Sequence, residues 1–245
     1  MFNKSILVSA ALLLISSQAS YAAIALDRTR VVYNESDKSI SLNISNENKQ
    51  LPYLVQAWIE DENGKKINSP ITVVPPLQRI EAQAKSQVRL LSLPAISALP
   101  KDRETVFYFN LREIPPRSDK PNTLQIALQT KVKLFFRPKS IIVNELDRAS
   151  PWQEKLVMER EGNKYSLKNP TPYYITIVSA TTGAKKEVDE FTPLMIAPFS
   201  SDYINAPALK LGDSPILTYI NDYGGHPQLS FQCSSSKCTS KPIKN

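Results

Sequence analysis

The sequence is poor in the residues from which most enzyme and metal centres are built. Among its 245 residues there are one histidine, His226, and two cysteines, Cys233 and Cys238. These three side chains are too few for a structural zinc site or a blue-copper site. The chain also lacks a G-x-S-x-G element, a phosphate-binding loop and a glycine-rich dinucleotide-binding turn. We therefore expect a protein that is not an enzyme and binds no metal and no cofactor.

Glycine is scarce as well, with 6 residues against 19 prolines. The prolines separate short segments, and most of these segments alternate apolar and polar residues. Few windows show the 3.6-residue period of a helix. This pattern predicts an all-β fold with regularly spaced turns.

Long apolar runs are absent too, since no stretch reaches the roughly 20 residues that a membrane-spanning helix needs. The one notable run, residues 6–15 (ILVSAALLLI), follows Lys4 and precedes the small residues Ser20 and Ala22. A basic start, a short apolar core and small residues at positions −3 and −1 are typical of a secretory signal peptide. An uncleaved buried helix is the alternative. We expect residues 1–22 to be removed and the mature chain to be exported without membrane insertion.

The charge is moderately basic, with 30 Lys and Arg against 23 Asp and Glu and a net charge of +7. The basic residues are scattered among acidic ones and form no continuous arm. Nucleic-acid binding proteins usually concentrate such charges on one face or tail. We expect no nucleic-acid partner.

Two groups of predicted strands surround a polar segment at residues 144–152. Strands are predicted at 51–59, 88–93, 105–114 and 124–136 before it, and at 165–167, 173–178, 194–196, 217–220 and 229–233 after it. Asn63-Gly64 predicts a two-residue hairpin turn. The lengths fit two immunoglobulin-like β-sandwich domains, residues 23–143 and 144–245.

Two local features carry further predictions. Cys233 and Cys238 are separated by four residues near the end of an exported chain, which favours a structural disulfide, with a pair of free thiols as the alternative. In the segment 124–136, Leu124, Ile126 and Leu128 share the parity of the later apolar residues. Periodicity alone favours a position of these three side chains in the core of their own domain.

Residues 99–116 (LPKDRETVFYFNLREIPP) resemble the signature of the periplasmic pilus chaperones of the usher pathway. The similarity extends to ALDRTRVVY, NKQLPYLVQAWIE, LQIALQTKVKLFFRP, NPTPYYIT and YINDYGG along the chain. The resemblance implies two immunoglobulin-like domains in a boomerang arrangement. It also implies a periplasmic chaperone that binds, folds and caps pilus subunits by donor-strand complementation and delivers them to an outer-membrane usher.

The resemblance assigns roles to individual residues. Leu124, Ile126 and Leu128 would be the apolar residues lent to an incomplete subunit, in place of the core position that periodicity favours. Arg30 and Lys133 would anchor the subunit's terminal carboxylate, and Glu104, Arg137 and Asp222 would form an interdomain salt-bridge network. Lys133 differs in parity from Leu128, so it would point to the opposite face unless a bulge intervenes. Both arrangements remain open at this stage.

Two other interpretations fit the sequence less well. A fibre subunit or adhesin would be a single incomplete domain, whereas the chain has two predicted domains. A secreted β-sandwich hydrolase or metal protein is disfavoured by the single histidine. An exposed apolar edge in the chaperone could also be capped by a second copy of the chain, as a dimer.

Overall fold

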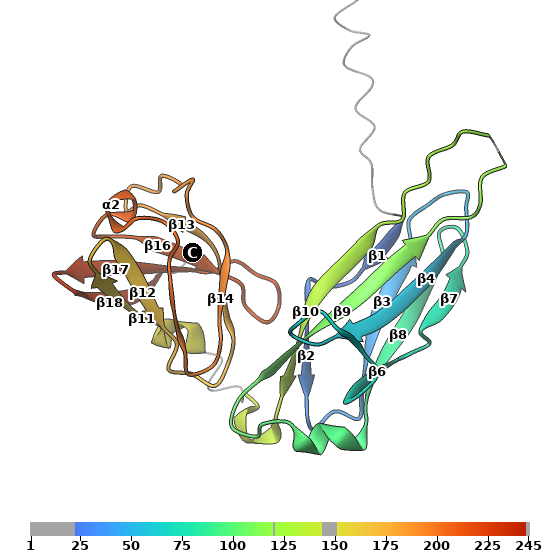
Figure 1. The fold of residues 1–245 in the computed structure, drawn as a ribbon, viewed down its shortest axis with the longest axis horizontal. Helices are drawn as coiled ribbons and strands as arrows, with labels where there is room; N and C mark the ends of the chain where they lie inside the picture. Colours follow the sequence, from blue (N-terminus) through green and yellow to red (C-terminus); the bar gives the residue numbers. More distant parts are fainter. Residues whose placement is uncertain (1–22, 120, 144–150, 244–245) are drawn as a thin grey trace, which may run out of the picture.

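The computed structural model describes residues 23–119, 121–143 and 151–243 (Figure 1). The predicted signal peptide and residues 144–150 of the predicted linker lie outside the described residues. Strands dominate on both sides of this linker, as the proline and alternation pattern predicts. The chain forms two β domains inclined to one another, which meet near the ends of β2 (Arg30–Asn34) and β10 (Gln129–Arg137) (Figure 1).

The N-terminal domain is a sandwich of two sheets. One sheet has the order β1-β3-β8-β6, and the other has the order β2-β10-β9-β4-β5 with β7 also paired to β4. The remaining strands are β1 (Ile24–Leu26), β3 (Ser39–Asn46), β4 (Tyr53–Glu60), β5 (Lys66–Ile67), β6 (Ile71–Val74), β7 (Leu77–Ile80), β8 (Lys85–Ser92) and β9 (Thr105–Ile114), with short 3₁₀ turns at Pro94–Ala98 and Lys139–Ile141. Within this domain β10 runs parallel to β2 and antiparallel to β9.

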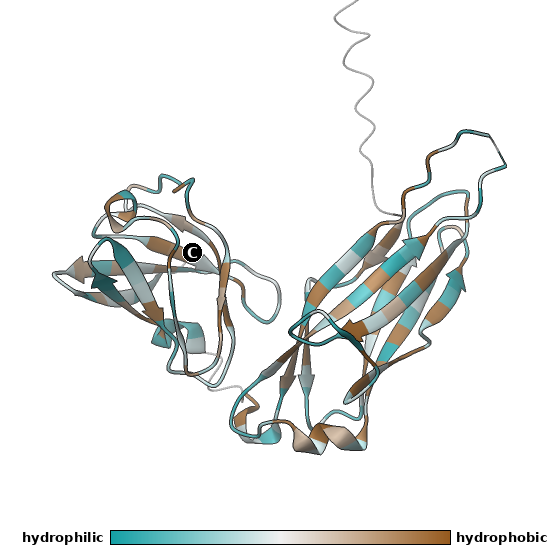
Figure 2. Ribbon diagram, in the orientation of Figure 1, coloured by the Kyte–Doolittle hydropathy of each residue, from teal (hydrophilic) through white to brown (hydrophobic). Residues whose placement is uncertain are grey.

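The C-terminal domain has one continuous hydrogen-bonded path, β14-β13-β16-β17-β18-β11-β12-β15, folded around its own core. Its strands are β11 (Val157–Glu161), β12 (Lys164–Lys168), β13 (Ile175–Thr181), β14 (Leu194–Ile196), β15 (Ser201–Tyr203), β16 (Ile216–Tyr219), β17 (Gln228–Ser234) and β18 (Lys237–Ile243), with a 3₁₀ turn at Trp152–Lys155 and a short helix α2 (Ala208–Leu211). The two domains have separate apolar cores, and Figure 2 shows apolar and polar residues alternating along their strands.

The predicted strand at 105–114 is confirmed by β9, whereas the predicted strand at 124–136 is too long at its start. Ladder pairing begins at Gln129, and residues 123–128 belong to no strand. The predicted two-residue turn at Asn63-Gly64 is also wrong. The Gly64 N–H donates to the Asp61 carbonyl at 3.0 Å, and the Asp61 N–H donates to Lys65 at 2.9 Å. Asp61 and Lys65 therefore flank a three-residue loop, in which only Gly64 has a positive φ.

Three strands of the C-terminal domain were not predicted, β11, β15 and β18. Their sequences, VMERE, SDY and KCTSKPI, contain little apolar alternation, because most of their side chains face solvent. Their positions are determined by pairing with β12 and β17 instead. The second group of strands is therefore larger than the sequence indicates.

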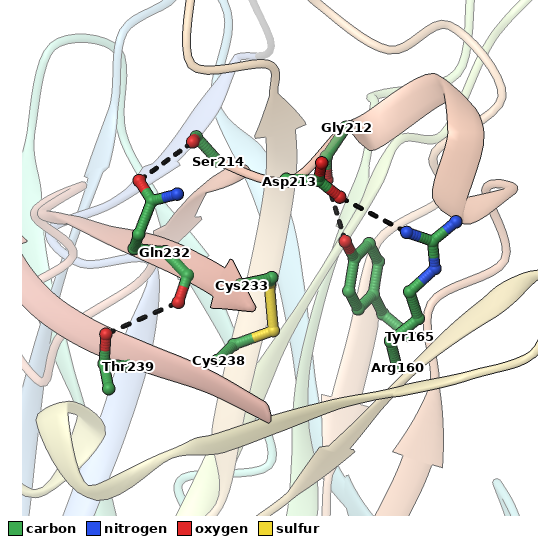
Figure 3. The surroundings of a disulfide bond; sticks show 9 residues. All are labelled: Arg160, Tyr165, Gly212, Asp213, Ser214, Gln232, Cys233, Cys238 and Thr239. Atoms are coloured by element: carbon green, nitrogen blue, oxygen red, sulfur yellow. Dashed lines mark hydrogen bonds and ion pairs between the residues drawn. A yellow bond between two sulfur atoms is a disulfide. The ribbon is translucent and has the colours of Figure 1, made fainter. Parts of the chain in front are cut away.

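Cys233 and Cys238 form the expected disulfide, which closes the hairpin of β17 and β18 (Figure 3). The two residues are direct cross-strand partners, with Cα atoms 3.9 Å apart. Cys233 belongs to the C-terminal core and Cys238 packs against it. The bridge thus holds the last two strands together at their turn.

Candidate functional site

Arg30 and Lys133 lie side by side on the outer face of the six-stranded sheet. They are direct partners in the parallel pairing of β2 and β10. Val132 and Leu134 point into the sandwich core, so the intervening Lys133 points to the opposite face. On this same face the ring of Phe135 stacks against Tyr174 of the other domain, with centroids 5.6 Å apart. The parity of Lys133 therefore needs no bulge, because the residue is reached from the side that faces the second domain.

The two cations have no anionic partner close enough for an ion pair among the described side chains. Arg30 is 8% exposed, and its Nη1 donates to the Ile220 carbonyl at 3.1 Å, while its buried Nε has no hydrogen-bond partner. Burial lowers the pKa of Arg30 and that of Lys133, and Arg30 lowers the latter further by repulsion. A carboxylate placed between them would satisfy both charges through charge-assisted hydrogen bonds.

Glu104, Arg137 and Asp222 are brought together at the junction of the domains. The Nε and Nη2 of Arg137 donate to Glu104 Oε1 at 2.9 and 2.6 Å. Its Nη1 donates to Asp222 Oδ2 at 2.9 Å. The other Glu104 oxygen accepts the backbone N–H of Tyr174 at 2.8 Å, so the carboxylate contacts both domains.

Aromatic rings enclose the Arg137 guanidinium. Its carbon lies 5.1 Å from the ring centroid of Trp152 and 4.9 Å from that of Tyr173. Burial raises the pKa of Glu104 to about 7, although Arg137 and the Tyr174 N–H favour its charged form. Desolvation of buried ion pairs often outweighs their attraction. Although it connects the two domains, this network is therefore not expected to add much to the stability of the fold.

The raised pKa of Glu104 gives a pH prediction. Its value of about 7 exceeds the ordinary 4.5, so the folded protein binds this proton more tightly than the unfolded chain. This contribution to stability is complete below 4.5 and is lost as the pH rises through 7. Glu104→Gln is neutral throughout and lacks this dependence. Its unfolding free energy should therefore rise relative to that of the wild type, by up to about 3 kcal/mol, as the pH increases across this interval. Urea denaturation measured along the interval checks this, and a difference that does not vary with pH would contradict it.

Residues 124–128 form an exposed apolar segment ahead of β10. Leu124 is 83% exposed, Ile126 62% and Leu128 45%. The core position that periodicity favours for these side chains is therefore wrong. The segment is connected to the sheet through the Leu128 carbonyl, which accepts the Glu113 N–H at 3.0 Å. Figure 1 shows the surrounding loop projecting from the end of the N-terminal domain that lies away from the domain junction.

Sequence reasoning missed the aromatic and linker residues around the site. Trp152, Tyr173 and Tyr174 come from the C-terminal half and contact Arg137 or Phe135. The motif NPTPYYIT contains both tyrosines, but nothing in its spacing indicates contact with the other domain. A cavity of about 560 Å³, lined in part by Arg30, Trp152 and Asp222, lies at this junction.

The described part of the chain shows neither a membrane-spanning helix nor a metal-binding cluster. None of its helices is long and apolar enough to cross a membrane. Within residues 23–119, 121–143 and 151–243, no group of three or more His, Cys, Asp or Glu side chains is arranged to hold a metal ion.

Comparison with known proteins identifies the family. Residues 23–142 match the model of the pili and flagellar-assembly chaperone PapD N-terminal domain, and residues 151–231 match that of the pili assembly chaperone PapD C-terminal domain. The chain is 50% identical over 248 residues to the chaperone protein PapD of Escherichia coli, with both chains covered fully. It is 41% identical over 225 residues to the chaperone protein PmfD of Proteus mirabilis, covering 90% of this chain and 87% of that protein.

Solved structures agree with this result. The periplasmic chaperone SfaE matches with a TM-score of 0.69 and 30% identity, covering 84% of this chain and 98% of that one. The structure of the Salmonella enterica SafA pilin in complex with the SafB chaperone matches with a TM-score of 0.70 and 26% identity, covering 92% and 98%. The chain belongs to the PapD family of pilus-assembly chaperones, whose members are non-enzymatic and periplasmic.

Proposed function

We propose that this chaperone captures a pilus subunit by lending it residues 124–128 as a missing strand. The observation that carries the proposal is the exposure of Leu124, Ile126 and Leu128 directly ahead of β10. A subunit that lacks a strand has an open groove with unpaired backbone groups. An added strand supplies main-chain hydrogen bonds, and its alternate side chains fill the groove. Each of the three apolar residues would contribute about 1.5–3 kcal/mol before ordering costs.

In this proposal Arg30 and Lys133 hold the terminal carboxylate of the subunit. Both are cations without an anionic partner among the described residues, and Lys133 is on the strand that continues from the lent segment. A chain end held at one point would set the register of the added strand. The lent side chains would then meet the correct positions of the groove.

Export and delivery complete the proposed function. Removal of residues 1–22 would release the mature chain into the periplasm, where the Cys233–Cys238 disulfide can form. The Glu104, Arg137 and Asp222 network would keep the angle between the domains constant. The loaded chaperone would then deliver its subunit to an outer-membrane usher.

The free chaperone would expose the segment 124–128, so we also propose that a second copy can cover it. Light scattering coupled to size exclusion tests this with the purified protein. A dimer that dissociates when a subunit is added would support the proposal, and a monomer at all concentrations would contradict it.

The central experiment is co-expression of the tagged chaperone with candidate subunits encoded beside its gene. Periplasmic extracts should yield a complex in which the subunit co-purifies with the chaperone and is lost when the chaperone is absent. Crosslinking from a photoreactive residue at position 126 should label the subunit. Recovery of a subunit that co-purifies with the chaperone but is not labelled from position 126 would overturn strand lending.

A further inference from the structure

Glu113 is a buried acidic residue that the proposed function does not use. It lies on β9, where the alternate residues Phe107, Phe109 and Leu111 all belong to the apolar core. Glu113 has the same parity as these three residues, and it is 5% exposed. Its carboxylate therefore lies on the inner side of the sandwich.

Among the described residues, the carboxylate accepts a hydrogen bond from the backbone N–H of Ile24, which donates to Oε2 at 2.9 Å. No lysine or arginine side chain of the described residues forms an ion pair with it. A buried carboxylate is costly unless it is paired and hydrogen-bonded. A positively charged group close to Ile24 would therefore stabilise the Glu113 carboxylate.

The residue next to Ile24 is Ala23, which the fold holds in place. Ala23 is 8% exposed, and its carbonyl accepts the Glu47 N–H at 2.7 Å. Ile24 is itself paired with Asn46 of β3. Because consecutive Cα atoms are about 3.8 Å apart, the nitrogen of Ala23 lies within one peptide unit of the Glu113 hydrogen bond.

We propose that Glu113 is a binding site for the α-ammonium group of the chain's own Ala23. The proposal depends on the proposed cleavage after Ala22. Hydrolysis of that peptide bond gives the hydroxyl of a water molecule to Ala22 and its hydrogen to the Ala23 nitrogen, which takes up a further proton. The new cation then pairs with Glu113. In the precursor the same nitrogen is an uncharged amide, so the ion pair exists only in the processed chain.

Acetylation of the exported protein tests this site. Only the unprotonated amine reacts with acetic anhydride, and an ion pair with Glu113 would stabilise the protonated form. The α-amine of Ala23 is expected to react about tenfold more slowly in the wild type than in Glu113→Gln. This factor corresponds to a pKa of the amine that is higher by about one in the wild type. The glutamine oxygen can still accept the Ile24 N–H, so the substitution removes only the charge. Peptide mapping by mass spectrometry follows the reaction, and equal rates would overturn the site.

A matched pair of exported chains gives a second test. One glycine inserted between Ala22 and Ala23 moves the α-ammonium group one residue away from Glu113. Glu113→Gln is expected to lower the melting temperature of the normal chain by about 2–4 °C and not that of the extended chain. An equal decrease in both would show that Glu113 acts without the terminal charge, and would overturn the proposal.

The N-terminal sequence of the exported protein tests cleavage separately. If it does not begin at Ala23, the proposed processing is wrong. The site is then tested by the same acetylation on a chain released at Ala23 from a fusion partner by a specific protease.

Discussion

Replacing Arg30 or Lys133 with alanine is expected to weaken subunit capture about 10- to 100-fold. Each charge-assisted hydrogen bond to a carboxylate contributes about 1.5–3 kcal/mol, and 1.4 kcal/mol corresponds to a factor of ten. The double variant should lose capture altogether in a pull-down. Titration of each purified variant with a subunit released from denaturant would measure the effect.

Loss of Lys133 should not destabilise the free protein. Arg30 and Lys133 repel one another, and burial lowers the pKa of both, so removal of Lys133 should leave the melting temperature unchanged or raise it. Lys131 provides a matched control, because it lies on the same face of β10 but pairs with Glu60 at 2.6 Å. Lys131→Ala should capture subunits normally. If binding survives the loss of both Arg30 and Lys133, the anchor lies elsewhere.

Replacing Ile126 with aspartate is expected to block capture and fibre assembly. Ile126 is the middle of the three exposed apolar residues, and its side chain would enter the subunit groove. A carboxylate forced into an apolar groove would be buried without a partner. The loss should exceed about 3 kcal/mol, or more than a hundredfold in affinity. Counting of surface fibres by electron microscopy and subunit pull-down would both report it.

Ala127→Asp is the control for this prediction. Ala127 is the exposed neighbour of Ile126, and in an extended segment its side chain points the opposite way. The same charge at this position should be tolerated, because it would remain in water. Equal defects in Ile126→Asp and Ala127→Asp would mean that charge on the segment, and not insertion of alternate side chains, decides capture.

Strand parity was the most informative part of the sequence. Counting by twos puts Lys133 on the face opposite to Leu128 unless a bulge intervenes, and the structure, with Val132 and Leu134 in the core, has no bulge there. The same counting was wrong for Leu124, Ile126 and Leu128. Period-two alternation requires a strand and a partner, and here the ladder begins only at Gln129. Alternation alone cannot distinguish an apolar side chain that packs in the core of its own domain from one that is exposed to solvent.

The contacts between the domains could not have been predicted from periodicity. Tyr173 and Tyr174 follow Pro172, and their side chains contact Arg137 and Phe135 across the junction. Such contacts depend on the angle between two separately folded units. The strands β11, β15 and β18 were not predicted for a related reason, because pairing with neighbouring strands, and not an apolar face, determines where they lie. At this junction the resemblance to a known family indicated only Glu104, Arg137 and Asp222, which the structure brings together.

The disulfide has a consequence for the cell's oxidation machinery. With two cysteines in the chain, one intramolecular pairing exists, so no wrong bridge has to be reshuffled. Both cysteines lie in the hairpin of β17 and β18, where they are direct cross-strand partners. A single oxidation event by a thiol oxidase would complete the chain, and a disulfide isomerase would have nothing to correct. The chaperone could therefore mature even when isomerase is in short supply.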